Sequence, residues 1–208
     1  MLFYCVGRYC EDDEMIATPD DYAWFSYEHF PGLADAYCFT YVRGLTPEQL
    51  VTRLGGRPED FTPMTLGELI EARYRHGYDT AFLGATTIGD WVFVVEPNVG
   101  LGADEGIITP LSAGTRLVSH FRDVEGVECF YWIEDEKTRF CFIADDGYSE
   151  EVPDEVAETL PRIGSDYRHL YPSEGPAFLL TERLTGITLT PELLEGSTYL
   201  CGVIPEPR

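Results

Sequence analysis

The sequence predicts an α+β domain in which an antiparallel β-meander of about five to seven strands is flanked by N-terminal and C-terminal helices. Three observations support this fold class. Two capped helix patterns come early, short β-prone segments separated by polar turns fill the middle, and helix patterns return toward the end. Consecutive strands without helices between them are typical of an antiparallel meander.

The N-terminal part divides into an appendage and the start of the domain. Residues 1–21 combine a short apolar strand pattern with an acidic run, so we expect an acidic appendage before a single domain at 22–208. A first strand is predicted at 36–42, because its aromatic residues alternate with a period of two. A buried helix over the same residues is the alternative.

Two helices follow, and their first residues identify them. Thr46 is an N-cap residue, a proline stands at the first helical position, and the glycine pair 55–56 is placed to end the helix. Thr65 and Glu68 form a capping box that opens a second helix, which ends at about His76.

The remaining elements follow from alternating patterns and further caps. We predict strands at 80–87, 91–96, 115–122, 127–134, 139–144 and 198–204. The polar turn at 135–138 marks the clearest hairpin of the sequence. Helices are predicted at about 153–161 and 174–185, with a short third helix opened by Thr190 and Pro191.

Charge is the most unusual property of the chain. Its 208 residues include 37 Asp and Glu against 14 Lys and Arg, which gives a formal net charge of −23 at pH 7. Such a chain repels phosphates and anionic lipid headgroups, so we expect no direct binding to nucleic acid or to a membrane. A basic protein partner would be attracted.

The N-terminus argues for a cytoplasmic protein. Residues 1–6 are apolar, but they lack the basic start and the cleavage site of a signal peptide. No run approaches the roughly 18 apolar residues that a membrane-spanning helix needs. We therefore expect the protein in the cytoplasm.

Neither the cysteines nor the histidines show the spacing of a metal site. Four cysteines stand in apolar or aromatic company and are predicted to be buried, reduced thiols: Cys38, Cys129, Cys141 and Cys201. The spacing of Cys5 and Cys10 allows a disulfide between them but does not require one. The four histidines are scattered without a ligand motif, so we expect no metal and no cofactor.

Two motifs resemble catalytic loops only in part. The segment Gly100–Gly106 lacks one glycine of the dinucleotide-binding pattern, because Glu105 stands in its place and would repel a pyrophosphate. We see no helix pattern after it and expect a flexible hairpin loop. Ser112 lies in half of a nucleophile-elbow motif without the strand and helix that the motif needs, so we interpret it as a turn residue.

Acidic residues concentrate between positions 134 and 158, where ten acids accompany two bases. Such density destabilises a fold through repulsion, so one interpretation is that it is retained to attract a basic partner. A surface that only confers solubility explains it equally well. We predict a non-enzymatic interaction domain, such as an immunity protein, an inhibitor or a mimic of nucleic acid. The predicted partner-binding residues are Glu134, Asp135, Glu136, Asp145, Asp146, Glu150, Glu151, Asp154 and Glu155.

The alternative prediction is an enzyme or a small-ligand-binding protein. Its ligand would lie in an aromatic-lined pocket between sheet and helices, gated by the glycine-rich loop at 99–106. The candidate ligand-binding residues are Trp91, His120, Arg122 and Trp132. No pair of carboxylates stands out as an acid and base, so no catalytic residue is predicted.

Four sequence segments together resemble those of a domain family of unknown function from high-GC Gram-positive bacteria. They are Ala36–Gly44, Gly89–Trp91, Leu111–Arg116 and Leu184–Leu194, and the resemblance covers about residues 22–204. It implies no catalytic residues. A weaker likeness, at the level of fold alone, is to α+β immunity domains that neutralise bacterial toxins.

Overall fold

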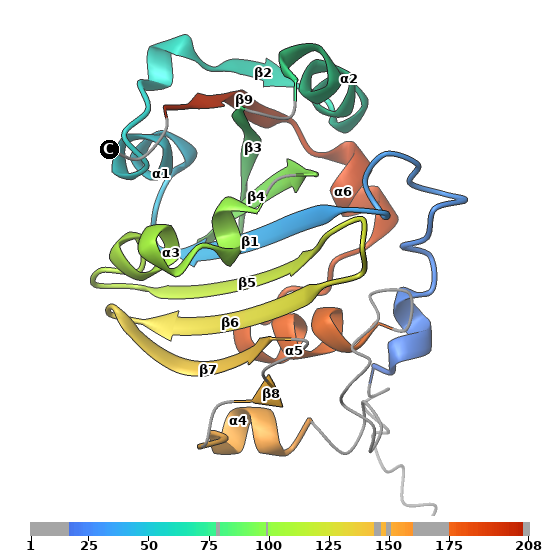
Figure 1. The fold of residues 1–208 in the computed structure, drawn as a ribbon, viewed down its shortest axis with the longest axis vertical. Helices are drawn as coiled ribbons and strands as arrows, with labels where there is room; N and C mark the ends of the chain where they lie inside the picture. Colours follow the sequence, from blue (N-terminus) through green and yellow to red (C-terminus); the bar gives the residue numbers. More distant parts are fainter. Residues whose placement is uncertain are drawn as a thin grey trace, which may run out of the picture.

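The computed structural model describes residues 17–77, 80–98, 100–143, 147–148, 151–159 and 175–205. It confirms the α+β class and the antiparallel sheet. Figure 1 shows one strongly twisted sheet with helices on both faces. The described residues contain nine strands, more than the five to seven predicted, in the order β2-β9-β3-β4-β1-β5-β6-β7-β8.

The elements have the following bounds. The strands are β1 (Tyr37–Arg43), β2 (Thr62–Met64), β3 (Ala81–Ile88), β4 (Trp91–Pro97), β5 (Arg116–Arg122), β6 (Glu128–Glu134), β7 (Lys137–Ile143), β8 (Gly147–Tyr148) and β9 (Tyr199–Ile204). The α-helices are α1 (Pro47–Arg53), α2 (Leu66–His76), α3 (Glu105–Leu111), α4 (Asp154–Ala157), α5 (Pro176–Thr185) and α6 (Pro191–Gly196). Three 3₁₀ turns are η1 (Pro19–Tyr22), η2 (Pro58–Asp60) and η3 (Leu101–Ala103).

The sheet is not a simple meander. Strands β5 to β8 follow one another as predicted, but β1 lies between β4 and β5 and pairs with both. Six of its seven residues are buried. A strand that is apolar on both faces belongs in the centre of a covered sheet, which explains why this early strand is inserted there.

Alternate residues of the sheet supply two separate cores. Phe39, Phe93 and Trp132 face a core completed by α2, α5, α6 and η1. Val42 and Ile133 face the other core, which α1 and α3 complete. The period-two pattern therefore builds both layers of packing around one sheet.

The predicted caps begin the helices where the sequence placed them. The Thr46 and Thr65 hydroxyl groups accept hydrogen bonds from the backbone N–H groups of Gln49 and Glu68, each at 3.3 Å. Thr190 caps α6 in the same way. The hairpin turn is tighter than predicted, because β7 begins at Lys137.

The prediction of a flexible loop without a following helix at 99–106 was wrong. The segment forms η3 and then α3, whose N-cap residue Asp104 accepts a hydrogen bond from Gly106 N–H at 2.8 Å. Ile108 and Leu111 bury the inner side of α3. A capping aspartate followed by this apolar pair was the signal that the sequence contained.

Several predicted features lie outside the described residues. They include the N-terminal strand pattern, Cys5 and Cys10, and the part of the 153–161 helix beyond Thr159. Cys38 and Cys201 are buried thiols outside any disulfide, as predicted, whereas Cys129 and Cys141, also predicted to be buried, are only half-buried. Within the described ranges, every helix is too short or too polar to cross a membrane.

Candidate functional site

The described part of the predicted acidic region lies at the turn between β6 and β7 and in and just before α4. Figure 1 shows α4 beyond β7 and β8, the last strands at that edge. Asp145, Asp146 and Glu150 lie outside the described residues. We define the acidic edge by the five predicted residues that are described and solvent-exposed: Asp135, Glu136, Glu151, Asp154 and Glu155.

The first part of the acidic edge is the two-residue turn between β6 and β7. Asp135 and Glu136 both adopt positive φ, 46° and 62°, as a tight hairpin of this hand requires. The Asp135 carboxylate accepts a hydrogen bond from Gly114 N–H at 2.9 Å, and Ser112 Oγ accepts one from Glu136 N–H at 3.0 Å. These bonds fix the turn against the loop that follows α3.

The second part of the acidic edge is α4. Val156 is fully buried and holds this single turn of helix on the molecule. Asp154 and Glu155 then face solvent, and their charge suits the first turn of a helix. Glu158, one residue beyond α4, pairs with Arg183 of α5 at 2.7 Å.

Four carboxylates of the acidic edge form no ion pair with another described residue. In the described part of the chain, no ion pair involves Glu136, Glu151, Asp154 or Glu155. Glu134, by contrast, is half-buried and bonded to Arg116. Glu134 was predicted to bind a partner, but its carboxylate already has a cation within the fold.

A second feature, an arginine hollow, lies at the end of the sheet where β1 ends and β5 begins. It encloses about 700 Å³ and is lined by Arg43, Arg53 and Arg116, together with acids and loop residues. Arg43 Nε donates to Asp90 at 2.7 Å, and this bond holds the pKa of Asp90 below its usual value. The sequence predicted no role for these arginines.

The four sequence segments that carry the family resemblance come together at or beside the arginine hollow. Arg43, Asp90 and Arg116 come from three of them, and Arg116 Nη1 donates at 3.1 Å to the carbonyl of Leu184, the first residue of the fourth. Residues this far apart in sequence give no local signal of their meeting. Only the pairing of β1 with β4 and β5 brings them together.

The four residues of the alternative prediction lie in the sheet and away from the four hollows that described residues form. Trp91 and Trp132 are almost completely buried in the core that α2, α5, α6 and η1 complete, His120 is buried beside Phe178 of α5, and Arg122 is half-buried. None of the four lines the hollows found among the described residues.

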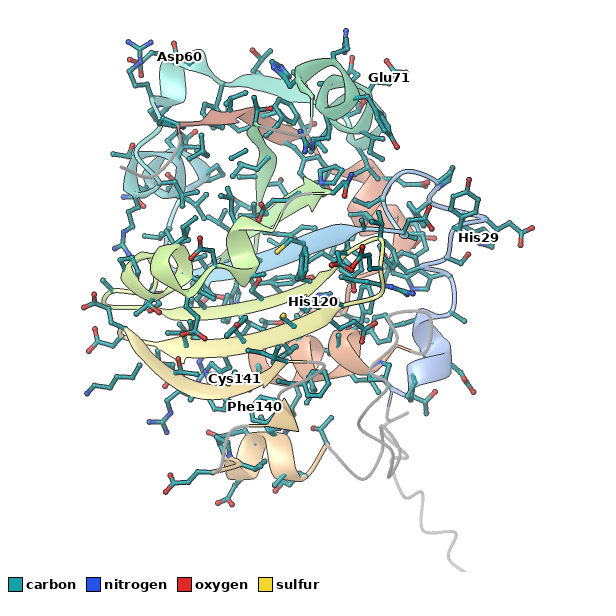
Figure 2. All side chains as sticks on the ribbon, in the orientation of Figure 1. His29, Asp60, Glu71, His120, Phe140 and Cys141 are labelled. Carbon is teal, nitrogen blue, oxygen red and sulfur yellow. The ribbon has the colours of Figure 1, made fainter. Side chains whose placement is uncertain are left out.

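His120 has the surroundings of a structural histidine. Figure 2 shows it in the interior of the molecule, and its Nδ1 lies 3.2 Å from the Tyr37 hydroxyl. The Phe178 ring lies 5.0 Å away, centroid to centroid. Burial lowers the pKa of His120 to about 3, so the ring is neutral at physiological pH.

Sequence reasoning also missed a buried acid. Glu96 is 1% exposed, near the end of the otherwise apolar strand β4. Its carboxyl group accepts backbone hydrogen bonds from Leu101 and Gly102, and burial raises its pKa to about 7. Thr40 and Ser119 lie nearby with their hydroxyl oxygens 2.9 Å apart. A lone glutamate inside an apolar run before a glycine-rich loop was the available signal.

Comparison with known proteins gives a family but no function. The family described as "Family of unknown function (DUF6461)" matches residues 15–208. No curated protein and no solved structure matches the chain. In the described ranges, no three His, Cys, Asp or Glu side chains gather as metal ligands would.

Proposed function

This chain belongs to the DUF6461 family, and we propose that it is a non-enzymatic interaction domain whose acidic edge binds a basic protein. The main support is the set of four exposed carboxylates that form no ion pair with another described residue, on Glu136, Glu151, Asp154 and Glu155. Unpaired like charges repel one another in the free protein. A basic partner relieves that repulsion on binding and is drawn in by the field before contact.

The acidic edge is also rigid, which favours binding. Hydrogen bonds from backbone N–H groups to the Asp135 carboxylate and the Ser112 hydroxyl hold the turn at Asp135 and Glu136, and the buried Val156 side chain holds α4. Carboxylates on fixed elements lose little conformational freedom when a partner binds. Flexible surface acids would lose more.

An inhibitory role suits this surface. The protein would cover a basic active site or nucleic-acid-binding groove on its partner, as an immunity protein does, with its carboxylates in place of phosphates. We place this activity in the cytoplasm of a high-GC Gram-positive bacterium, where Cys38 and Cys201 remain reduced thiols.

Affinity capture from a lysate of the native host tests the proposal. The bait is the full chain in three forms: wild type, the acidic-edge variant Glu151→Gln/Asp154→Asn/Glu155→Gln, and a control variant with the same change in charge. The control is Glu28→Gln/Glu59→Gln/Glu71→Gln, whose residues are equally exposed. Figure 2 shows Glu71 at the opposite end of the molecule from α4.

The expected result is a basic protein that is retained by the wild type and the control variant but lost from the acidic-edge variant. High salt should release it, because ions screen the contact. If all three baits retain the same proteins at the same salt concentration, the acidic edge is not the binding surface.

A further inference from the structure

A second binding surface lies on the other face of the molecule from α5. An apolar groove of about 480 Å³ runs between α1, α3 and the end of β9. Its walls come from half-buried or buried aliphatic side chains: Leu54, Leu101, Ile107, Leu111 and Ile204. Pockets of this size and character commonly hold small molecules.

Arg53 provides a cation at the rim of this apolar groove. Its Nη1 group donates to the carbonyl oxygens of Leu111 at 3.1 Å and Ala113 at 2.9 Å. A guanidinium has five N–H groups, so the Nε and Nη2 edge is left for other acceptors. This edge presents two parallel donors, the arrangement that binds a carboxylate in bidentate fashion.

Arg53 differs in this respect from its neighbours around the arginine hollow. The Nε groups of Arg43 and Arg116 already donate to the carboxylates of Asp90 and Glu134. No carboxylate of the described residues pairs with Arg53. The carbonyl groups at the end of α3 also hold the guanidinium in place, so that binding does not have to order it.

We propose that the apolar groove binds a small monocarboxylic acid with an apolar chain or ring. The apolar part lies between α1 and α3, and the carboxylate accepts hydrogen bonds from Nε and Nη2 of Arg53. A single negative charge fits best, because a chain of net charge −23 repels polyanions. This site takes a ligand of opposite charge to the partner of the acidic edge.

Isothermal titration calorimetry with octanoate tests the site. Octan-1-ol serves as a probe with the same chain and no charge. We expect saturable octanoate binding to the wild type, and binding of octan-1-ol that is at least about tenfold weaker, because the charge-assisted hydrogen bonds are lost. Absence of octanoate binding at about 1 mM, or equal binding of the two probes, overturns the proposal.

Two substitutions locate the binding in the groove. Arg53→Gln should weaken octanoate about 10- to 100-fold and leave octan-1-ol unchanged. The matched control is Arg57→Gln, which removes the same charge from an exposed arginine paired with Asp60. Equal octanoate affinity of Arg53→Gln and wild type contradicts the assignment.

A third substitution covers the case in which Arg53→Gln unfolds. Ile107 is half-buried in the groove wall, and Ile107→Glu places a negative charge there without changing Arg53. It should abolish octanoate binding, and retained binding rejects the groove. The acidic-edge variant should bind octanoate as the wild type does. Each of the two proposals can therefore be rejected without affecting the other.

Discussion

The carboxyl group of Glu96 accepts a hydrogen bond of 2.9 Å from the backbone N–H of Leu101, which ties the loop before α3 to the buried centre of the sheet. Gly102 donates to the other carboxyl oxygen at 3.3 Å. Glu96 thus positions α3, and with it one wall of the apolar groove. It does so at the expense of burying an ionisable group.

The pH dependence of stability should show the ionisation of Glu96. Its pKa of about 7 lies above the value of 4.5 for an unfolded chain, so the folded state binds the proton more tightly. Protonation of Glu96 therefore contributes about 3 kcal/mol to the free energy of unfolding below pH 4.5. This contribution is lost as the pH rises through 7. Between pH 5 and pH 8, urea unfolding should show that the wild type loses about 2.5 kcal/mol of stability more than Glu96→Gln does. Parallel pH profiles would contradict the burial of a titrating Glu96.

His120 should give the opposite slope. Its pKa of about 3 lies below the unfolded value of 6.5, so the folded state binds the proton less tightly. Stability is fully present above pH 6.5 and falls by about 1.4 kcal/mol per unit as pH decreases toward 3. The double variant Tyr37→Phe/His120→Phe removes the histidine without leaving the Tyr37 hydroxyl unpaired, and it should lose this acid sensitivity. Tyr37→Phe alone should keep it.

A side chain at Gly102 should disrupt the contact between η3 and the sheet. A Cβ atom there would lie 2.1 Å from Thr40 Oγ1 and 2.4 Å from Ser119 Oγ. Gly102→Ala should therefore destabilise the protein by roughly 1–3 kcal/mol or more in denaturant unfolding. Gly106→Ala is the control, because its nearest atom is 3.1 Å away, and it should change stability by less than about 1 kcal/mol. Equal effects would mean that η3 does not pack as described.

Backbone strain in the acidic turn should be measurable. Glu136 has a φ of 62°, which glycine adopts without steric penalty. Its contact with Ser112 uses the backbone N–H, so Glu136→Gly keeps it and should stabilise the protein by about 0.5–1 kcal/mol. Asp135→Gly should instead destabilise, since it removes the carboxylate that bonds Gly114. A loss of thermal stability in Glu136→Gly would contradict the turn geometry.

Local signals predicted most of the helices and strands, whereas their arrangement in the sheet depends on long-range pairing. Thr46 and Thr65 began helices where expected, because a cap acts within four residues. The insertion of β1 between β4 and β5 depends on contacts that no local pattern encodes. The arginine hollow depends on that insertion, so its members were visible in the sequence but their meeting was not. The acidic edge was predictable in part, because charge density is a property of composition.

The association rate of the captured basic partner tests the proposed function most directly. At an ionic strength of about 10 mM, where charges act over roughly 30 Å, the variant Glu151→Gln/Asp154→Asn/Glu155→Gln should associate severalfold more slowly than wild type. At about 1 M salt the two rates should converge. Equal rates at low ionic strength would contradict a docking role for the acidic edge.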